Sequence, residues 1–279
     1  MNFKTLLAAA AVSMIAGGAV AQTAEWRTVS PENLWVIDTA KGRVLVELEP
    51  RAAPAHIERI RTLTQQGFYD GLKFHRVIPN FMAQTGDPKG TGEGGSELPD
   101  LKGEFSFRRG RDSGFVAVEN SGPGVRGIMG SLPITTQPDA QMFVTADFKV
   151  GASGLFCPGV AGMARAGSPD SANSQFFLMT GQNDNLNGGY TTFGRVVQGL
   201  DVVKALKAGD DAEDGKVADP DVMTKVQLAS ALPEGQRPTV RVAVPGSPAF
   251  NAAVEAARTA RGAQFGICDV QPVVEVTGG

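Results

Sequence analysis

The sequence predicts a mainly β fold, either a barrel or a sandwich, with a few flanking helices. Short apolar runs of strand type recur along the chain, whereas only two or three segments have helical spacing. No regular alternation of strand and helix patterns appears, which argues against a parallel α/β sheet. Glycine occurs 35 times and proline 17 times among the 279 residues, which favours many turns over long helices.

The first 21 residues have the pattern of a secretory signal peptide. Residues 1–4 include a lysine, residues 5–20 are apolar and rich in alanine, and residues 19–21 fit a small-x-small cleavage site. The apolar stretch is shorter than the ~20 residues that a membrane-spanning helix needs, so a cleaved leader is favoured over an anchor. We therefore expect an exported protein, located in a bacterial periplasm, with no membrane attachment after cleavage.

The sequence pattern in the N-terminal third of the mature chain predicts a hairpin, a helix and two further strands. Residues 35–50 contain two apolar runs separated by TAKG, which predicts a β-hairpin. Residues 53–71 have helical spacing, with Pro54 suited to the first turn and Gly67 to the position after the last turn. Residues 72–88 predict a strand, a turn and a second strand.

The remainder of the chain predicts further strands. Residues 89–104 are rich in glycine but lack a Gly-Lys-Ser/Thr sequence, so we expect a flexible loop near a site and not a phosphate cradle. Residues 107–156 predict short strands between Gly, Pro and Asp residues. Clearer strand patterns follow at 159–167, 174–181, 189–197 and 221–233, a short helix is expected at 198–209, and a strand, a helix and a strand are expected at 239–244, 247–262 and 265–276.

Composition and motifs exclude several classes of function. The formal net charge of -3 offers no basic surface for nucleic acid. His56 and His75 are the only histidines, which leaves a metal site poorly supplied with imidazole ligands. The chain has no Gly-x-Ser-x-Gly motif, and neither cysteine lies in a nucleophile pattern. If the chain is an enzyme, we expect chemistry without covalent attack, a metal or a cofactor.

The two cysteines, Cys157 and Cys268, leave two alternatives open. In an oxidising compartment they can form a disulfide, and otherwise they are two buried free thiols. The residues alone do not decide between the two, because pairing depends on how close the Cα atoms lie.

One stretch places polar side chains in an apolar run. Residues 74–88 read FHRVIPNFMAQTGDP, so His75, Arg76 and Gln84 are surrounded by Phe, Val, Ile and Met. Rotation about an X–Pro bond has a barrier of roughly 18–20 kcal/mol and breaks no bond. Its catalyst needs an apolar pocket for the proline ring and a donor for the nitrogen of the twisted amide, which a fixed guanidinium can supply.

Three blocks of sequence resemble the cyclophilin family of peptidyl-prolyl cis–trans isomerases. They are residues 74–88, residues 159–181 (GVAGMARAGSPDSANSQFFLMTG) and residues 186–203 (LNGGYTTFGRVVQGLDVV), in the order and approximate spacing of the family. The resemblance covers residues 34–233 apart from one long interruption. It implies a closed eight-stranded antiparallel barrel capped by two helices. It also implies isomerase activity on proline-containing unfolded or exported polypeptides.

The resemblance also implies the site residues. Arg76 matches the catalytic arginine that donates to the twisted prolyl amide, and Gln84 matches the glutamine that binds the substrate backbone and holds the arginine. His75 points the other way along the strand and is interpreted as structural. The substrate-binding positions are Phe81, Met82 and Phe177 as walls of the proline pocket, Ala164 and Arg165 along the bound peptide, Gln175 beside the site, Leu186 in the pocket and Tyr190 at its rim.

The chain departs from the family in several places. Asn185 stands where many relatives carry a Trp that is linked to cyclosporin binding, so weak cyclosporin binding is expected. Many relatives also carry Asn where this chain has Arg165. Residues 108–155 look inserted into a domain that spans 22–233, and residues 234–279 look like a β-α-β extension. Cys157 lies just after the insertion and Cys268 lies in the extension, which suggests a disulfide that clamps the tail to the core.

An alternative function uses the same pocket without catalysis. The chain could be a proline-peptide binding or chaperone module with little turnover, in which the insertion provides the partner surface. Arg76 argues against this alternative, because a protein that only binds proline does not need the guanidinium.

Overall fold

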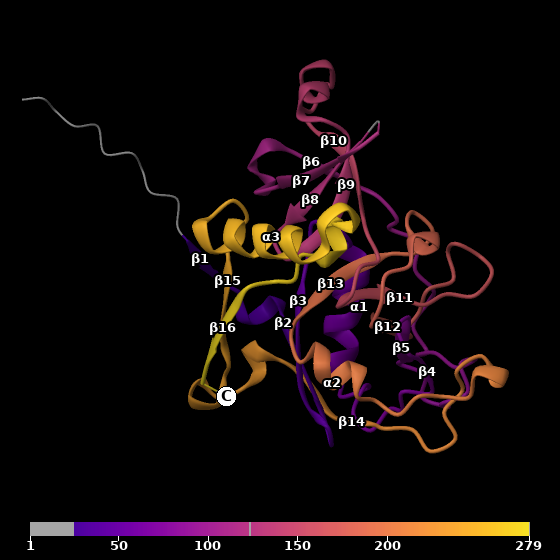
Figure 1. Ribbon diagram of the computed structural model, residues 1–279. Coiled ribbons are helices and arrows are strands. Elements are labelled where there is room, and N and C mark those ends of the chain that lie inside the picture. Colours follow the sequence, from indigo (N-terminus) through magenta and orange to yellow (C-terminus); the bar gives the residue numbers. More distant parts are fainter. Residues whose placement is uncertain (1–24, 123, 279) are drawn as a thin grey trace, which may run out of the picture.

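Three antiparallel sheets and three α-helices make up the computed structural model in Figure 1, which describes residues 25–122 and 124–278. The predicted signal peptide lies outside these residues. Within them, no helix is long and apolar enough to cross a membrane.

The main sheet carries the strands that the sequence predicted most clearly. Its order is β14-β2-β3-β13-β11-β12-β5-β4. The predicted hairpin is confirmed as β2 and β3, and the predicted helix at 53–71 is confirmed as α1. The bounds are β2 (Leu34–Thr39), β3 (Gly42–Leu48), α1 (Pro54–Gln65), β4 (Arg76–Ile78), β5 (Met82–Thr85), β11 (Val160–Met163), β12 (Phe176–Met179), β13 (Thr192–Gln198), α2 (Leu200–Lys204) and β14 (Met223–Leu228).

The closed barrel implied by the family resemblance is wrong for this chain, because the main sheet is curled but open. Its two edges are β14 and β4, and within the described residues no strand ladder joins them. Irregular segments cross the gap instead: Val77 N donates to Gly215 O over 2.8 Å, and Phe74 N donates to Asp221 O over 2.9 Å. The segment before β14 includes Pro220, which has no N–H to donate to a continuous ladder.

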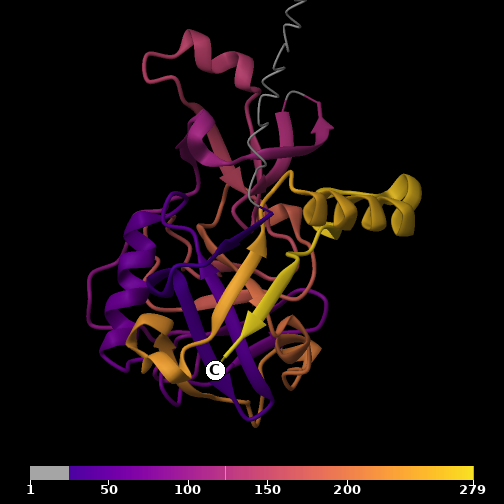
Figure 2. The same cartoon turned by 90° about the vertical axis from the view of Figure 1, so that its left-hand side faces the viewer.

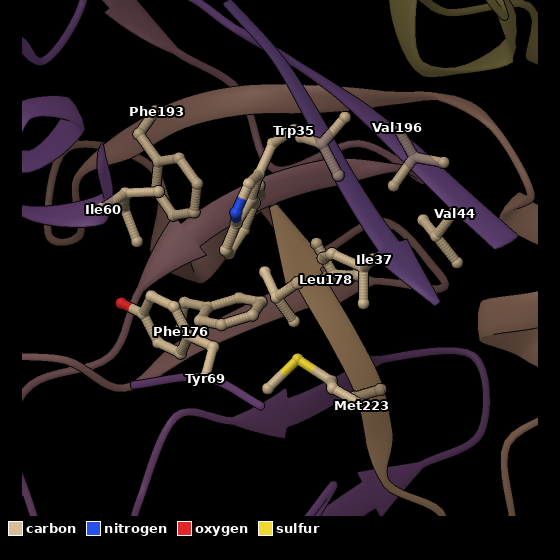
Figure 3. Packing of buried hydrophobic residues seen from close by; sticks show 14 of the residues in the cluster. Trp35, Ile37, Val44, Ile60, Tyr69, Phe176, Leu178, Phe193, Val196 and Met223 are labelled. Atoms are coloured by element: carbon tan, nitrogen blue, oxygen red, sulfur yellow. The ribbon is translucent and has the colours of Figure 1, made fainter. Parts of the chain in front are cut away.

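Aromatic side chains fill the inner face of the main sheet (Figure 3). The Trp35 ring lies 4.8 Å from the Phe176 ring, 5.6 Å from the Tyr69 ring and 6.3 Å from the Phe193 ring, centroid to centroid. Trp35 Nε1 donates to Thr64 Oγ1 over 2.9 Å, so the buried indole N–H is satisfied by α1. This packing fixes the strands on which the candidate site is built.

The predicted insertion forms a sheet of its own, with the order β6-β10-β9-β8-β7. It stands above the main sheet in both ribbon views (Figures 1 and 2). Its apolar residues Ile128, Met129 and Leu132 belong to the same buried cluster as Met82 and Phe177. The strands are β6 (Phe107–Arg109), β7 (Val116–Ser121), β8 (Gly124–Met129), β9 (Leu132–Thr136) and β10 (Val150–Gly154).

The two ends of the described chain meet in a third sheet, with the order β1-β15-β16. The predicted strand, helix and strand of the C-terminal extension are confirmed as β15, α3 and β16. Figure 2 shows β15 and β16 side by side, with α3 projecting beyond them. Val240 and Val242 of β15 share a buried cluster with Val36 and Leu45 of the main sheet. The bounds are β1 (Trp26–Thr28), β15 (Thr239–Ala243), α3 (Pro248–Arg261) and β16 (Val274–Thr277).

Two links fasten the extension to the rest of the protein. A disulfide joins Cys157 to Cys268, whose Cα atoms lie 4.9 Å apart, which decides between the two alternatives that the sequence left open. The buried Arg195 of β13 donates from Nη1 to Ser131 O over 3.1 Å and from Nη2 to Val270 O over 2.9 Å. One guanidinium therefore connects the main sheet, the insertion and the tail.

Candidate active site

Arg76 is held at the edge of the main sheet by a row of hydrogen bonds. β4 and β5 pair so that Arg76 lies opposite Gln84, and Arg76 Nη1 donates to Gln84 Oε1 over 3.2 Å. Gln84 Nε2 donates to Gln175 Oε1 over 2.9 Å, and Gln175 Nε2 donates to the carbonyl oxygens of Gly92 and Gly94 over 2.9 and 2.7 Å. This row connects the glycine-rich loop to the guanidinium, so the predicted residues Arg76, Gln84 and Gln175 form one hydrogen-bonded chain.

Asp214, which no sequence pattern indicated, holds the other side of the same guanidinium. Arg76 Nε donates to Asp214 O over 2.9 Å, and Nη2 donates to Asp214 Oδ1 over 2.9 Å. The neighbouring Gly215 has a φ of +77° and lies so close to Ile78 that a Cβ would clash there. Glycine therefore lets this acidic turn approach β4.

The guanidinium keeps hydrogen-bonding capacity for a substrate. Arginine carries five N–H donors, of which the bonds to Gln84 and Asp214 occupy three. Nη1 also lies 3.9 Å from Met82 Sδ, which belongs to the adjacent apolar pocket. Arg76 is thus fixed on both sides and lines the pocket, and N–H groups remain on its terminal nitrogens.

A small pocket of about 140 Å³ lies beside Arg76. The structure brings nine of the ten predicted site residues together around it, and Gln175 lies in the neighbouring groove. The pocket is lined by Arg76, Phe81, Met82, Gln84, Ala164, Arg165, Phe177, Leu186 and Tyr190. Its size and apolar walls suit one small ring with a polar group at the mouth.

Packed aromatic rings support one wall of this pocket, and one of them, Phe156, was not predicted. The Phe177 ring stacks on the Phe156 ring at a centroid distance of 5.6 Å, and the Tyr190 ring meets Phe177 edge-on at 6.1 Å. A Cβ on Gly162 would clash with both phenylalanine rings, so glycine at this position in β11 lets them lie flat. Phe156 precedes Cys157, so the disulfide is attached next to a ring that packs on the pocket residue Phe177.

A larger groove of about 550 Å³ continues from the proline-sized pocket. It is bordered by the glycine-rich loop, which is arranged around one carboxylate: Asp87 accepts from the main-chain N–H groups of Lys89, Thr91 and Gly92 over 2.7, 2.8 and 2.6 Å. Burial raises the pKa of Asp87, but these main-chain hydrogen bonds outweigh it and lower the pKa to about 2. The loop predicted to lie near the site therefore does so, and Asp87 organises it.

Both histidines are buried away from the pocket lining. Both ring nitrogens of His75 are buried without a partner in the described structure. His56 Nδ1 lies 2.7 Å from Glu104 Oε2. Burial is the main cause that lowers the pKa of each imidazole, so both favour the neutral form. The structural interpretation of His75 stays a prediction.

No cluster of three or more His, Cys, Asp or Glu side chains in the described ranges is placed to hold a metal ion. Asn185 is exposed on the 3-10 turn Asp184–Leu186 and does not line the pocket, although its neighbour Leu186 does. The Asn185 side chain is therefore exposed next to a pocket residue without contributing to the pocket wall.

Comparisons with known proteins agree on the family. The family model for cyclophilin type peptidyl-prolyl cis-trans isomerase/CLD matches residues 34–228. A probable peptidyl-prolyl cis-trans isomerase of Brucella suis is 37% identical over 240 residues, which cover 82% of this chain and 97% of that protein. A peptidyl-prolyl cis-trans isomerase-like 1 protein of Aspergillus fumigatus is 34% identical over 174 residues, which cover 61% of this chain and 80% of that protein.

A solved structure is similar to nearly the whole chain. The crystal structure of a cyclophilin from Hirschia baltica is 33% identical, with a TM-score of 0.81, and the match covers 91% of this chain and 94% of that chain. That coverage reaches well beyond residues 34–228, the part that the family model matches.

Proposed function

The chain belongs to the cyclophilin-type peptidyl-prolyl cis-trans isomerase family, and we propose that it accelerates X–Pro bond rotation in exported or unfolded polypeptides through Arg76. The observation that carries the mechanism is the doubly held guanidinium at the mouth of the apolar pocket. Gln84 and Asp214 fix it, and terminal N–H groups remain for a substrate.

In this mechanism the proline ring enters the pocket formed by Phe81, Met82 and Phe177. As the amide twists, its nitrogen lone pair is no longer delocalised and becomes a hydrogen-bond acceptor. Arg76 donates to that nitrogen only in the twisted state, so the interaction lowers the barrier without equally stabilising the planar ground state. Gln84 binds the substrate backbone and keeps Arg76 in place.

The size of the Arg76 contribution follows from one charged hydrogen bond. Such a bond contributes about 1.5–3 kcal/mol, and each 1.36 kcal/mol corresponds to a tenfold change in rate. We therefore expect Arg76→Ala to lower kcat/KM by about 10- to 150-fold. The matched control is Arg111→Ala, because Arg111 lies on the insertion against Phe143, outside the pocket.

The test is catalysed isomerisation of a proline-containing peptide by the mature chain, Arg76→Ala and Arg111→Ala. A fast wild type, a slow Arg76 variant and an active Arg111 variant support the proposal. If the wild type barely exceeds the uncatalysed rate, the pocket serves as a binding site for proline peptides, which is the alternative of a module with little turnover.

We also propose that the protein is exported and works in the periplasm. The N-terminal pattern at residues 1–21 supports this location. The Cys157–Cys268 disulfide supports it as well, because disulfides persist in oxidising compartments. Fractionation of cells that make the full chain tests the location: a mature chain in the periplasmic fraction is expected, and an uncleaved cytoplasmic chain would contradict it.

A further inference from the structure

Arg165 lies at the junction between the proline-sized pocket and the larger groove. Its side chain lines both of them, as do Gln84 and Ala164. It follows directly after β11 and Ala164, so its main chain is positioned by the main sheet. A peptide whose proline sits in the pocket must pass this guanidinium as its chain enters the groove.

The Arg165 guanidinium is held in a defined place. Nε donates to Gly189 O over 2.9 Å, and Nη1 donates to Ala166 O over 2.9 Å. Its Cζ lies 4.3 Å from the centroid of the Tyr190 ring, which is close enough for a cation–π interaction. A side chain that is already ordered loses little further freedom when a ligand binds to it.

The positive charge of Arg165 has no counter-ion in the part of the chain that the structure describes. Across residues 25–122 and 124–278, no carboxylate lies within ion-pair distance of it, and Nη2 has no hydrogen-bond acceptor. Arg76, the other cation lining the pocket, is paired with Asp214. The carbonyl groups around Arg165 orient its charge but do not neutralise it, so a carboxylate from outside would complete the site.

From this geometry we propose that Arg165 is a specificity-determining residue that selects substrates with an acidic side chain within two residues of the proline. The inference rests on the proposed function and names a substrate class for it. The substrate carboxylate accepts from Nη2, while the bonds to Gly189 and Ala166 stay in place.

The lining of the groove also includes residues of the opposite charge. Glu93 and Asp100 line it, and both are exposed. Neither carboxylate lines the proline-sized pocket, whereas Arg165 lines both pocket and groove, so the acidic preference is expected close to the proline. Peptides with Lys at the same positions therefore test the sign of the effect.

The experiment uses Ala-based peptides with one proline, in which each of the two residues before and after it is changed in turn to Glu, Gln or Lys. The readout is the ratio of kcat/KM for the Glu peptide to that for the matched Gln peptide, measured for the mature wild type, Arg165→Gln, Arg165→Lys and the control Arg111→Gln. Using a ratio separates specificity from any general loss of activity.

At one or more positions the wild-type ratio of kcat/KM for the Glu peptide to that for the Gln peptide is expected to be about 3 to 10 at low salt. This is the size of effect that a partly buried ion pair provides. The preference should shrink in high salt, fall to about 1 in Arg165→Gln, persist in part in Arg165→Lys and be unchanged in Arg111→Gln. A ratio near 1 at every position, a ratio unchanged in Arg165→Gln, or a preference for Lys would overturn the inference.

Failure of the proposed function would look different. If no peptide is isomerised, the affinities of the same Glu and Gln peptides are measured by fluorescence titration, and their ratio tests Arg165 by the same criteria. Loss of catalysis with a Glu preference in binding keeps this inference and removes the isomerase. Catalysis without any Glu preference keeps the isomerase and overturns the inference about Arg165.

Discussion

Loss of the Cys157–Cys268 disulfide should destabilise the protein strongly. The bond closes a loop with a sequence separation of 111 residues. The loop-entropy relation gives about 5 kcal/mol for a loop of that length, and measured losses are typically about 2–4 kcal/mol. Cys157 is fully buried in the cluster that includes Phe156 and Phe177, so a freed tail also exposes apolar surface. We expect a fall of about 2–5 kcal/mol in the free energy of unfolding.

The assay is urea unfolding of the mature wild type, with and without reductant, and of Cys157→Ala/Cys268→Ser. The reduced wild type and the double variant should show matching losses, whereas reductant should not affect the variant further. Free energies of unfolding within about 0.5 kcal/mol of one another for all samples would refute the reasoning, since surface changes alone stay within that range.

Three further predictions concern pH, positioning and inhibition. The pKa values of His56 and His75 are lowered below the ordinary 6.5, so their contribution to stability is present above pH 6.5 and is lost as the pH falls through the folded-state pKa. Urea unfolding should therefore give a smaller free energy of unfolding near pH 5.5 than near pH 7.5. Equal free energies at the two pH values would contradict this prediction. Asp214→Asn removes the ion pair to Arg76. The Asp214 side chain is 79% exposed, so the pair contributes less than about 1 kcal/mol and kcat/KM should fall by about 2- to 5-fold. An unchanged kcat/KM would show that Asp214 does not position the guanidinium. Cyclosporin should not inhibit peptide isomerisation at sub-micromolar concentrations, and Asn185→Trp should strengthen the inhibition. Sub-micromolar inhibition of the wild type would contradict the expectation that Asn185 makes cyclosporin binding weak.

The strand and site patterns that could be predicted are local ones. Two apolar runs at 35–50, separated by the short sequence TAKG, were sufficient to predict the hairpin of β2 and β3. Arg76 and Gln84 meet because their two strands are joined by a tight turn. The other pocket residues were located by the resemblance of three sequence blocks to the cyclophilin family, not by local patterns alone.

Long-range contacts could not be predicted in the same way. Asp214 lies 138 residues from Arg76 and belongs to a GDDAEDG turn that looks like any solvated acidic loop. β1 spans only Trp26–Thr28 and pairs with β15, more than two hundred residues away, and three residues carry no usable periodicity. The open edge of the main sheet likewise depends on how the irregular segment 209–222 hydrogen-bonds to β4, and no local sequence pattern specifies those bonds.

The most direct test of the central claim separates rate from affinity at Arg76. NMR exchange measurements on a proline peptide give both the catalysed rotation rate and the dissociation constant for wild type and Arg76→Ala. If Arg76 acts on the twisted amide, the rate falls by about 10- to 150-fold while the dissociation constant changes by less than about threefold. A rate that hardly changes, or an affinity that falls as much as the rate, would contradict the claim that Arg76 stabilises the transition state.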